Sequence, residues 1–285
     1  MSLFSVVMTA FNAEDTIAES IESVLKQSYS DFEFIIINDG STDNTRSIIC
    51  SYTDERIRLI DNNHDYIQSL NIGLNVSTGK YIARMDADDI MHIDRLKLQY
   101  SIMEEFPNIT VCSSWEIIFG KKTVIKIFEQ KESGLIELPL VQLLFDDIII
   151  NPTATIRRSF LSEHHLLYEN YSYAEDYKFW AKTAMLGGVF YIDSQPLVYR
   201  RISHEQITNK YRDLQIETSL KIKKEILNFL CNRYKDTYPA FNNLYNSYTE
   251  LIEQKLISDN DIFSLFYSLF TKNKDTFKSL ENSNK

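Results

Sequence analysis

The segment of the sequence best suited to chemistry is the acidic run Asp86-Ala87-Asp88-Asp89. It directly follows residues 81–85, an apolar run typical of a buried strand. Carboxylates are hard oxygen ligands for Mg²⁺ or Mn²⁺, and these ions commonly complete their coordination with substrate phosphates. Without a cation, carboxylates gathered at an apolar strand end repel one another. The context therefore favours a metal-assisted phosphate site, although an isolated acidic turn more often caps a helix.

A second polar segment, Asn38-Asp39-Gly40-Ser41, follows another apolar run at residues 32–37. The Asp39 carboxylate can accept hydrogen bonds from a nucleobase or a ribose, and Gly40 lets the chain turn close to a ligand. An Asx turn that starts a helix explains the same residues equally well.

Two further candidates lie in the second half of the chain. Glu175-Asp176 opens a predicted helix, where a carboxylate serves either as a general base or as a favourable charge at the helix N-terminus. His204 follows Tyr199-Arg200-Arg201, and an imidazole or cations there could neutralise a metal-bound diphosphate or bind Mn²⁺. A lone histidine is more often structural.

The elements that must position these residues alternate between β-rich and amphipathic runs from Phe4 to about Ser113, which predicts a parallel sheet with crossover helices. We expect strands at residues 4–8, 32–37, 57–60 and 81–85, with Asn12 and Ser41 as helix N-caps. Ligands of open α/β sheets bind beyond the carboxyl ends of strands. Thr9, Asp39 and Asp86 are therefore expected to share one crevice.

The remaining chain predicts strands near residues 109–118, 123–128, 189–192 and 197–199, and a helical tail over residues 211–285. The tail places Phe263, Phe266, Tyr267 and Phe270 before three lysines. Core packing or self-association explains these aromatic residues better than peripheral contact with a membrane that carries a lipid-linked acceptor.

Composition excludes several classes of protein. The hydrophobic content of 44% over 285 residues supports a folded core, and the net charge of -10 disfavours nucleic acid as a partner. The absence of a CxxC pair, a signal peptide or a long apolar run predicts a cytoplasmic protein. A dinucleotide oxidoreductase is disfavoured because no GxGxxG follows the first strand.

Together these segments resemble the family-2 glycosyltransferases, which have the GT-A fold. The resemblance covers Phe4 to about Arg95 and continues more weakly to about His204. Its motifs are the opening strand and nucleotide loop, the Asn-Asp-Gly segment and the stretch around the acidic run, which are here residues 5–12, 34–43, 71–73, 79 and 84–89. Two departures are Phe11, where many relatives have Tyr, and Leu70, where many carry Arg; Arg84 is a candidate to replace that arginine.

The resemblance implies an α/β mixed sheet flanked by helices over residues 1–210, with a nucleotide-binding half (1–113), an acceptor half (114–210) and a C-terminal helical extension (211–285). It implies inverting transfer of a sugar from a nucleotide-diphosphate donor, favouring UDP, to a sugar or lipid-linked saccharide acceptor, in polysaccharide or glycoconjugate synthesis. Mn²⁺ or Mg²⁺ would be the cofactor. Asp88 and His204 would be metal ligands, and Asp176 would be the general base, with Glu175 beside it. The residues that would contact the donor are Thr9, Ala10, Phe11, Asp39, Arg84, Asp86, Ala87, Asp88 and His204.

Two alternatives to a glycosyltransferase are a catalytically silent nucleotide-sugar binding module and a sugar-phosphate nucleotidyltransferase. The nucleotidyltransferase predicts a Gly-rich basic loop that residues 9–15 lack.

Overall fold

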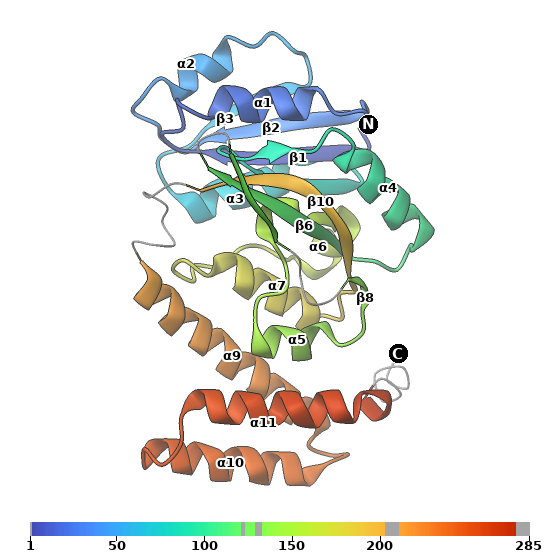
Figure 1. Cartoon of the computed structure of the whole chain (residues 1–285), viewed down its shortest axis with the longest axis vertical. Helices are drawn as coiled ribbons and strands as arrows, with labels where there is room; N and C mark the ends of the chain where they lie inside the picture. The colour runs from blue at the N-terminus through green and yellow to red at the C-terminus, as the bar shows by residue number, and fades with distance from the viewer. Residues whose placement is uncertain (1, 121–122, 129–132, 203–210, 278–285) are drawn as a thin grey trace. The chain divides into compact units, whose positions relative to one another are not determined.

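The computed structural model describes residues 2–120, 123–128, 133–202 and 211–277 (Figure 1). The chain divides into two compact units, each built from separate stretches of sequence. The first unit comprises residues 1–136, 149–170 and 188–209. The second comprises residues 137–148, 171–187 and 210–285.

The first unit is built on a mixed sheet, which has ten strands in the described residues and the order β3-β2-β1-β4-β9-β6-β10-β5, with β7 on β6 and β8 on β10. Strands β3, β2, β1 and β4 are parallel, whereas β9 is antiparallel to both of its neighbours. The strands are β1 (Phe4–Ala10), β2 (Phe32–Asn38), β3 (Ile57–Asp61), β4 (Tyr81–Asp86), β5 (Ile90–Met91), β6 (Val111–Gly120), β7 (Thr123–Phe128), β8 (Gly134–Ile136), β9 (Thr155–Arg157) and β10 (Phe190–Arg201). The helices of this unit are α1 (Ile17–Leu25), α2 (Thr45–Cys50), α3 (Tyr66–Val76), α4 (Arg95–Glu105), the 3₁₀ turn η1 (Asn151–Thr153) and α6 (Arg158–His164).

Helices cover both faces of the parallel strands, so β1 and β2 are buried almost throughout. On one face, Val6 and Met8 belong to the same apolar cluster as Ile21 of α1. On the other, Gly73 of α3 lies so close to Val7 that a Cβ atom there would stand 2.3 Å from its Cγ1 atom. Figure 1 shows α1 and α3 on opposite sides of these strands. Coverage on both faces explains why these strands read as continuous apolar runs rather than alternating ones.

Three local predictions differ from the structure. Asn12 does not cap α1, whose N-cap is Thr16; instead its side chain accepts a hydrogen bond from the backbone of Thr42. Ser41 does not cap α2, because the chain takes three more residues before the helix and its N-cap is Asn44. The separate strands expected at 189–192 and 197–199 are one strand, β10, whose pairing with β6 continues through register shifts around Pro196.

The second unit is helical in its described residues and contains α5 (Pro139–Phe145), α7 (Glu175–Met185), α9 (Arg212–Tyr234), α10 (Pro239–Glu253) and α11 (Asp259–Lys272). The helical tail is thus confirmed, and its aromatic residues Phe263, Phe266 and Phe270 are buried. Core packing accounts for these rings, as the first of the two interpretations above predicts. None of the helices in the described part of the chain combines the length and apolar character that a bilayer crossing requires.

Candidate active site

The carboxyl ends of β1, β2 and β4 meet at one edge of the sheet. In the parallel register, Thr9 of β1 is paired with Ile37 on one side and with Asp86 on the other, and Ala10 is paired with Asn38. Asp39 follows directly, and its backbone N–H donates to the carbonyl oxygen of Ala10 at 2.8 Å. The first unit therefore brings together the strand ends that the sequence predicts to share a crevice.

The acidic run forms a cluster that could hold a metal ion. Asp86, Asp88 and Asp89 each offer a carboxylate oxygen, and these atoms lie within 4.8 Å of one another. The loop that carries them is anchored to α1, since the Ser20 hydroxyl donates to the carbonyl oxygens of Ala87 and Asp89. The resemblance implies Asp88 and His204 as metal ligands, and the structure places carboxylate oxygens of Asp86 and Asp89 beside that of Asp88.

The electrostatics of this cluster favour a cation. Burial and the charge of Asp86 raise the pKa of Asp88 to about 6. The same causes, with the charge of Asp88 added, raise the pKa of Asp89 well above its ordinary value. The Oδ2 atom of Asp89 is also buried without a hydrogen-bond partner within the described residues. Since a divalent cation would offset this repulsion and offer the orphaned oxygen a partner, the residues present fit Mg²⁺ or Mn²⁺.

Arg84 lies in β4 beneath this cluster and is almost completely buried. Its guanidinium is 2.7 Å from Asp86 and donates to the Tyr66 hydroxyl of α3 at 3.1 Å. Burial alone lowers the pKa of Arg84, but the charge of Asp86 and the Tyr66 and Tyr168 hydroxyls together outweigh it and raise the pKa overall. The arginine therefore stays protonated and orients Asp86. A contact between Arg84 and the nucleobase of the donor stays a prediction.

Asp39 is 2% exposed and held by donors that come from the segment after β3. Its Oδ1 atom accepts hydrogen bonds from the Ser69 hydroxyl at 2.7 Å and from the Asp65 backbone at 2.8 Å. Its Oδ2 atom lies 3.6 Å from Nδ1 of His64. The carboxylate is thus fixed in orientation at the strand end, as a group that reads a ligand requires.

Phe11 follows β1 in the predicted nucleotide loop and is exposed, with 45% of its surface accessible. Its ring stacks on that of His64, with centroids 4.1 Å apart. His64 has a positive φ of 47°, and its backbone lies against Gly40, where a Cβ atom would stand 3.0 Å from the His64 nitrogen. Sequence reasoning missed His64, because nothing in its spacing links it to Phe11 across fifty residues.

The end of β10 is tied to the acidic loop by Arg201. Its backbone N–H donates to Asp89 at 2.9 Å, and its Nε donates to the carbonyl oxygen of Asp88 at 2.8 Å. The sequence singled out this arginine as a charge near a diphosphate, and the structure adds a positioning contact. His204, the other predicted metal ligand, lies outside the described residues.

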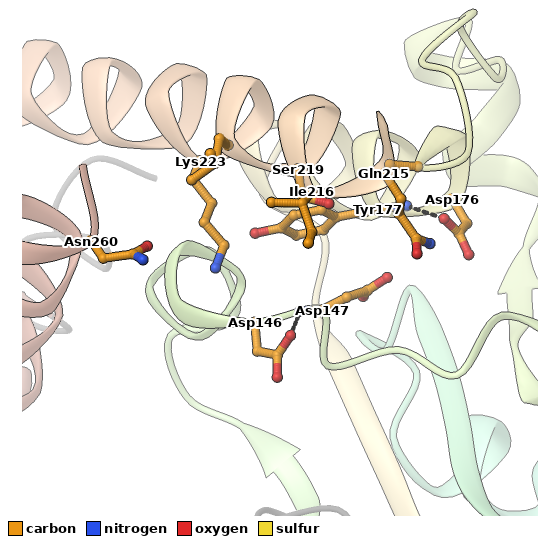
Figure 2. A pocket seen from close by; sticks show the side chains of 11 residues that line it. Asp146, Asp147, Asp176, Tyr177, Gln215, Ile216, Ser219, Lys223 and Asn260 are labelled. Carbon is orange, nitrogen blue, oxygen red and sulfur yellow. Dashed lines mark hydrogen bonds between the residues drawn. The ribbon is translucent and has the colours of Figure 1, made fainter. Parts of the chain in front are cut away.

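Asp176 belongs to the second unit, where it lies in the first turn of α7 and accepts a hydrogen bond from the backbone of Tyr177 at 2.7 Å. It lines a pocket of about 430 Å³, whereas Glu175 does not. The sequence predicts both carboxylates as candidates for the general base. The structure distinguishes them, because Asp176 lines the pocket and Glu175 does not. Figure 2 shows the pocket, whose other polar residues are Asp146, Asp147, Gln215, Ser219, Lys223 and Asn260.

These other pocket residues were not predicted. Asp146 and Asp147 follow the apolar helix α5 and could have been noticed as an acidic pair after a helix. Gln215 and Lys223 carry no motif, and they reach the pocket because α9 packs across the second unit.

Comparison with known proteins agrees with this geometry. Residues 5–165, more than half of the chain, match the model of the family described as glycosyl transferase family 2. An uncharacterised glycosyltransferase of Haemophilus influenzae is 39% identical over 243 residues, which cover 81% of this chain and 75% of that protein. An Escherichia coli UDP-Glc:alpha-D-GlcNAc-diphosphoundecaprenol beta-1,3-glucosyltransferase, WfgD, is 36% identical over 126 residues, which cover 44% of this chain and 50% of that protein.

Solved structures share the fold at low sequence identity. S. aureus TarS in complex with UDP-GlcNAc aligns with a TM-score of 0.66 and 19% identity, covering 81% of this chain and 67% of that chain. The mannosyltransferase PcManGT from Pyrobaculum calidifontis, in complex with GDP-Man and Mn²⁺, aligns with a TM-score of 0.59 and 15% identity, covering 99% of this chain and 84% of that chain. With its strand ends, acidic cluster and family match in agreement, this chain belongs to the family-2 glycosyltransferases and has their GT-A fold.

Proposed function

We propose that this glycosyltransferase moves a sugar from a UDP-sugar to an acceptor hydroxyl with inversion, in the synthesis of a polysaccharide or glycoconjugate. The observation that carries the proposal is the convergence of Thr9, Asp39 and the acidic cluster at one sheet edge. This edge offers a fixed carboxylate for a nucleoside and a cation site for a diphosphate. Nothing in the family match favours a silent binding module or a nucleotidyltransferase.

The choice of UDP is supported by relatives. The E. coli protein WfgD is named for a UDP-Glc donor, and the TarS structure contains UDP-GlcNAc. The mannosyltransferase structure contains GDP-Man, so the fold also accommodates a purine nucleotide. UDP is favoured here on the family resemblance and on these relatives.

Each group has a proposed role in the transfer. Asp88, with Asp86 and Asp89, would hold Mn²⁺ or Mg²⁺, which supplies charge that stabilises a departing diphosphate. Asp39 would accept hydrogen bonds from the base, while Thr9, Ala10 and Phe11 border it. Asp176 would accept the proton of the acceptor hydroxyl as that oxygen attacks the anomeric carbon from the face opposite the diphosphate, which gives inversion.

A thermal-shift screen of nucleotide sugars, with and without Mn²⁺, tests this function. A donor at about one hundred times its dissociation constant stabilises the folded protein by about 2.7 kcal/mol, which raises the melting temperature by roughly 5 °C. We expect a UDP-sugar to give this shift only with Mn²⁺, and Asp88→Asn to abolish it. Replacement of the exposed Asp236 by Asn is the matched control and should leave the shift unchanged. The proposal would be overturned if none of the nucleotide sugars raised the melting temperature, or if Asp88→Asn gave the same shift as the wild type.

A further inference from the structure

The pocket around Asp176 is built by four segments that lie far apart in the sequence. Asp146 and Asp147 follow α5, and Asp176 lies in the first turn of α7. Gln215, Ser219 and Lys223 lie on α9, and Asn260 lies on α11. Figure 2 shows the α9 side chains directed from one helix toward Asp146 and Asp147. The pocket has a volume of about 430 Å³, which is in the range of small-molecule sites. The C-terminal helices therefore supply one wall of a cavity whose other wall carries the proposed base.

The α9 wall is fixed by contacts to the segments opposite it. Lys178 of α7 forms an ion pair with Glu225 of α9, and the Tyr171 hydroxyl donates to the same carboxylate at 2.7 Å. Lys223 donates from Nζ to the carbonyl oxygen of Phe145 at 2.5 Å, directly beside Asp146. Gln215 donates to the carbonyl oxygen of Tyr173 at 2.9 Å. The pocket is thus preformed in the second unit, which lowers the entropic cost of binding.

The chemistry of the lining suits a molecule rich in hydroxyl groups. Carboxylates, amides and the Ser219 hydroxyl offer both acceptors and donors, as the alternating donors and acceptors of a sugar require. The apolar groups of Ile216 and Leu220 and the Tyr177 ring lie among them and can contact the C–H faces of a sugar ring.

The charge of the lining restricts the ligand further. The charged side chains among the described residues that line the pocket are three carboxylates, those of Asp146, Asp147 and Asp176, and one lysine, Lys223. The ammonium of that lysine already bonds to a carbonyl oxygen, and burial lowers its pKa. A ligand with a phosphate or carboxylate would therefore meet net repulsion, whereas a neutral or amine-bearing ligand would not.

We propose that this pocket binds the acceptor end of a neutral or amine-bearing saccharide, and that α9 and α11 form the wall that selects it against phosphorylated and acidic sugars. This inference rests on the proposed function, because it assigns the substrate class to the site that contains Asp176. It gives the C-terminal helical extension a direct part in substrate choice.

A glycan array probed with the full-length protein tests the inference, using neutral, amine-bearing, carboxylated and phosphorylated glycans as probes. We expect binding to be confined to the neutral and amine-bearing classes. Ser219→Trp, which fills the pocket, should reduce this binding at least tenfold. Ser264→Trp, an exposed serine of α11 outside the pocket, is the matched control and should bind as the wild type does. The double variant Asp146→Asn, Asp147→Asn should gain binding to acidic glycans.

Three results would overturn the inference: no bound glycan, binding only of acidic glycans, or equal binding by Ser219→Trp and the wild type. The Mn²⁺-dependent shift with a UDP-sugar, measured on the same preparations, separates this failure from failure of the proposed function. If all variants show the normal donor shift and also bind glycans as the wild type does, only the assignment of the pocket is rejected. Loss of the donor shift in the wild type rejects the function itself, and a retained donor shift in Ser219→Trp shows that the variant is folded.

Discussion

Asp176 and Glu175 are adjacent acidic residues in the first turn of α7, but only Asp176 lines the pocket. We predict that Asp176→Asn lowers kcat about 10²- to 10⁴-fold, since a positioned base contributes a factor of this size. Donor affinity, measured as the Mn²⁺-dependent thermal shift, should stay within twofold of the wild type. Glu175→Gln should cause a smaller loss of kcat.

Asp213→Asn is the control for this experiment, because Asp213 is an exposed acid in the first turn of α9 that does not line the pocket. It separates loss of a base from loss of a favourable charge at a helix N-terminus. Retained turnover in Asp176→Asn would remove this residue from the mechanism.

Residue types predicted which segments come together at the strand ends better than they predicted the contacts between them. The acidic run predicts a cluster of carboxylates, which the structure contains, because these side chains are local to one turn. The pairing of Arg84 with Asp86 and the stacking of His64 on Phe11 depend on α3 and the segment before it, which no local pattern places.

The position of α3 sets the geometry around Arg84 and Asp39 in the proposed donor site. Its first two turns supply Tyr66 to Arg84 and Ser69 to Asp39. Gly73 allows this approach, since a Cβ atom at that position would overlap Val7 of β1 at 2.3 Å. The helix can approach the sheet this closely only with glycine there.

We predict that Gly73→Ala destabilises the protein by about 1–3 kcal/mol, the usual cost of overpacking a core. Alanine favours a helix by about 1 kcal/mol over glycine, so the steric term must exceed this gain. Denaturant unfolding measures the stability, and the donor shift should fall because α3 moves away from Asp39. Asn75→Ala, at an exposed position of the same helix, should leave both unchanged. Equal stability of the two variants would contradict the close-packing argument.

The elements themselves were largely predictable, and the misses at Asn12 and in β10 have the same physical cause. Residues 32–37 and 81–85 read as buried strands because apolar runs covered on both faces carry that signal directly. The prediction that Asn12 caps α1 is wrong because its side chain bonds to the distant Thr42 instead. The prediction of two strands within β10 is wrong because pairing with β6 keeps them in one strand. The α9 side chains that line the Asp176 pocket could not be predicted, because the packing of one helix against another has no short sequence motif.

Each of the two units of the chain has its own packed core. The second unit is closed by aromatic packing in which Phe270 is fully buried and stacks on Phe241 with centroids 5.5 Å apart. Tyr234 and Phe277 contact the same ring. Since this cluster contains no residue of the sheet, damage to it should act first on the helices.

We predict that Phe270→Ala costs about 3–5 kcal/mol, the usual range for a buried phenylalanine, and that the loss is concentrated in α9, α10 and α11. Hydrogen exchange followed by mass spectrometry should show faster exchange in these helices, while β1, β2 and β4 keep their protection. Leu256→Ala is the control, because Leu256 is 65% exposed and its removal should leave exchange unchanged. If β1, β2 and β4 lose protection to the same extent as the helices, the two units unfold as one cooperative body. The helical wall of the pocket could then not be varied independently of the donor site.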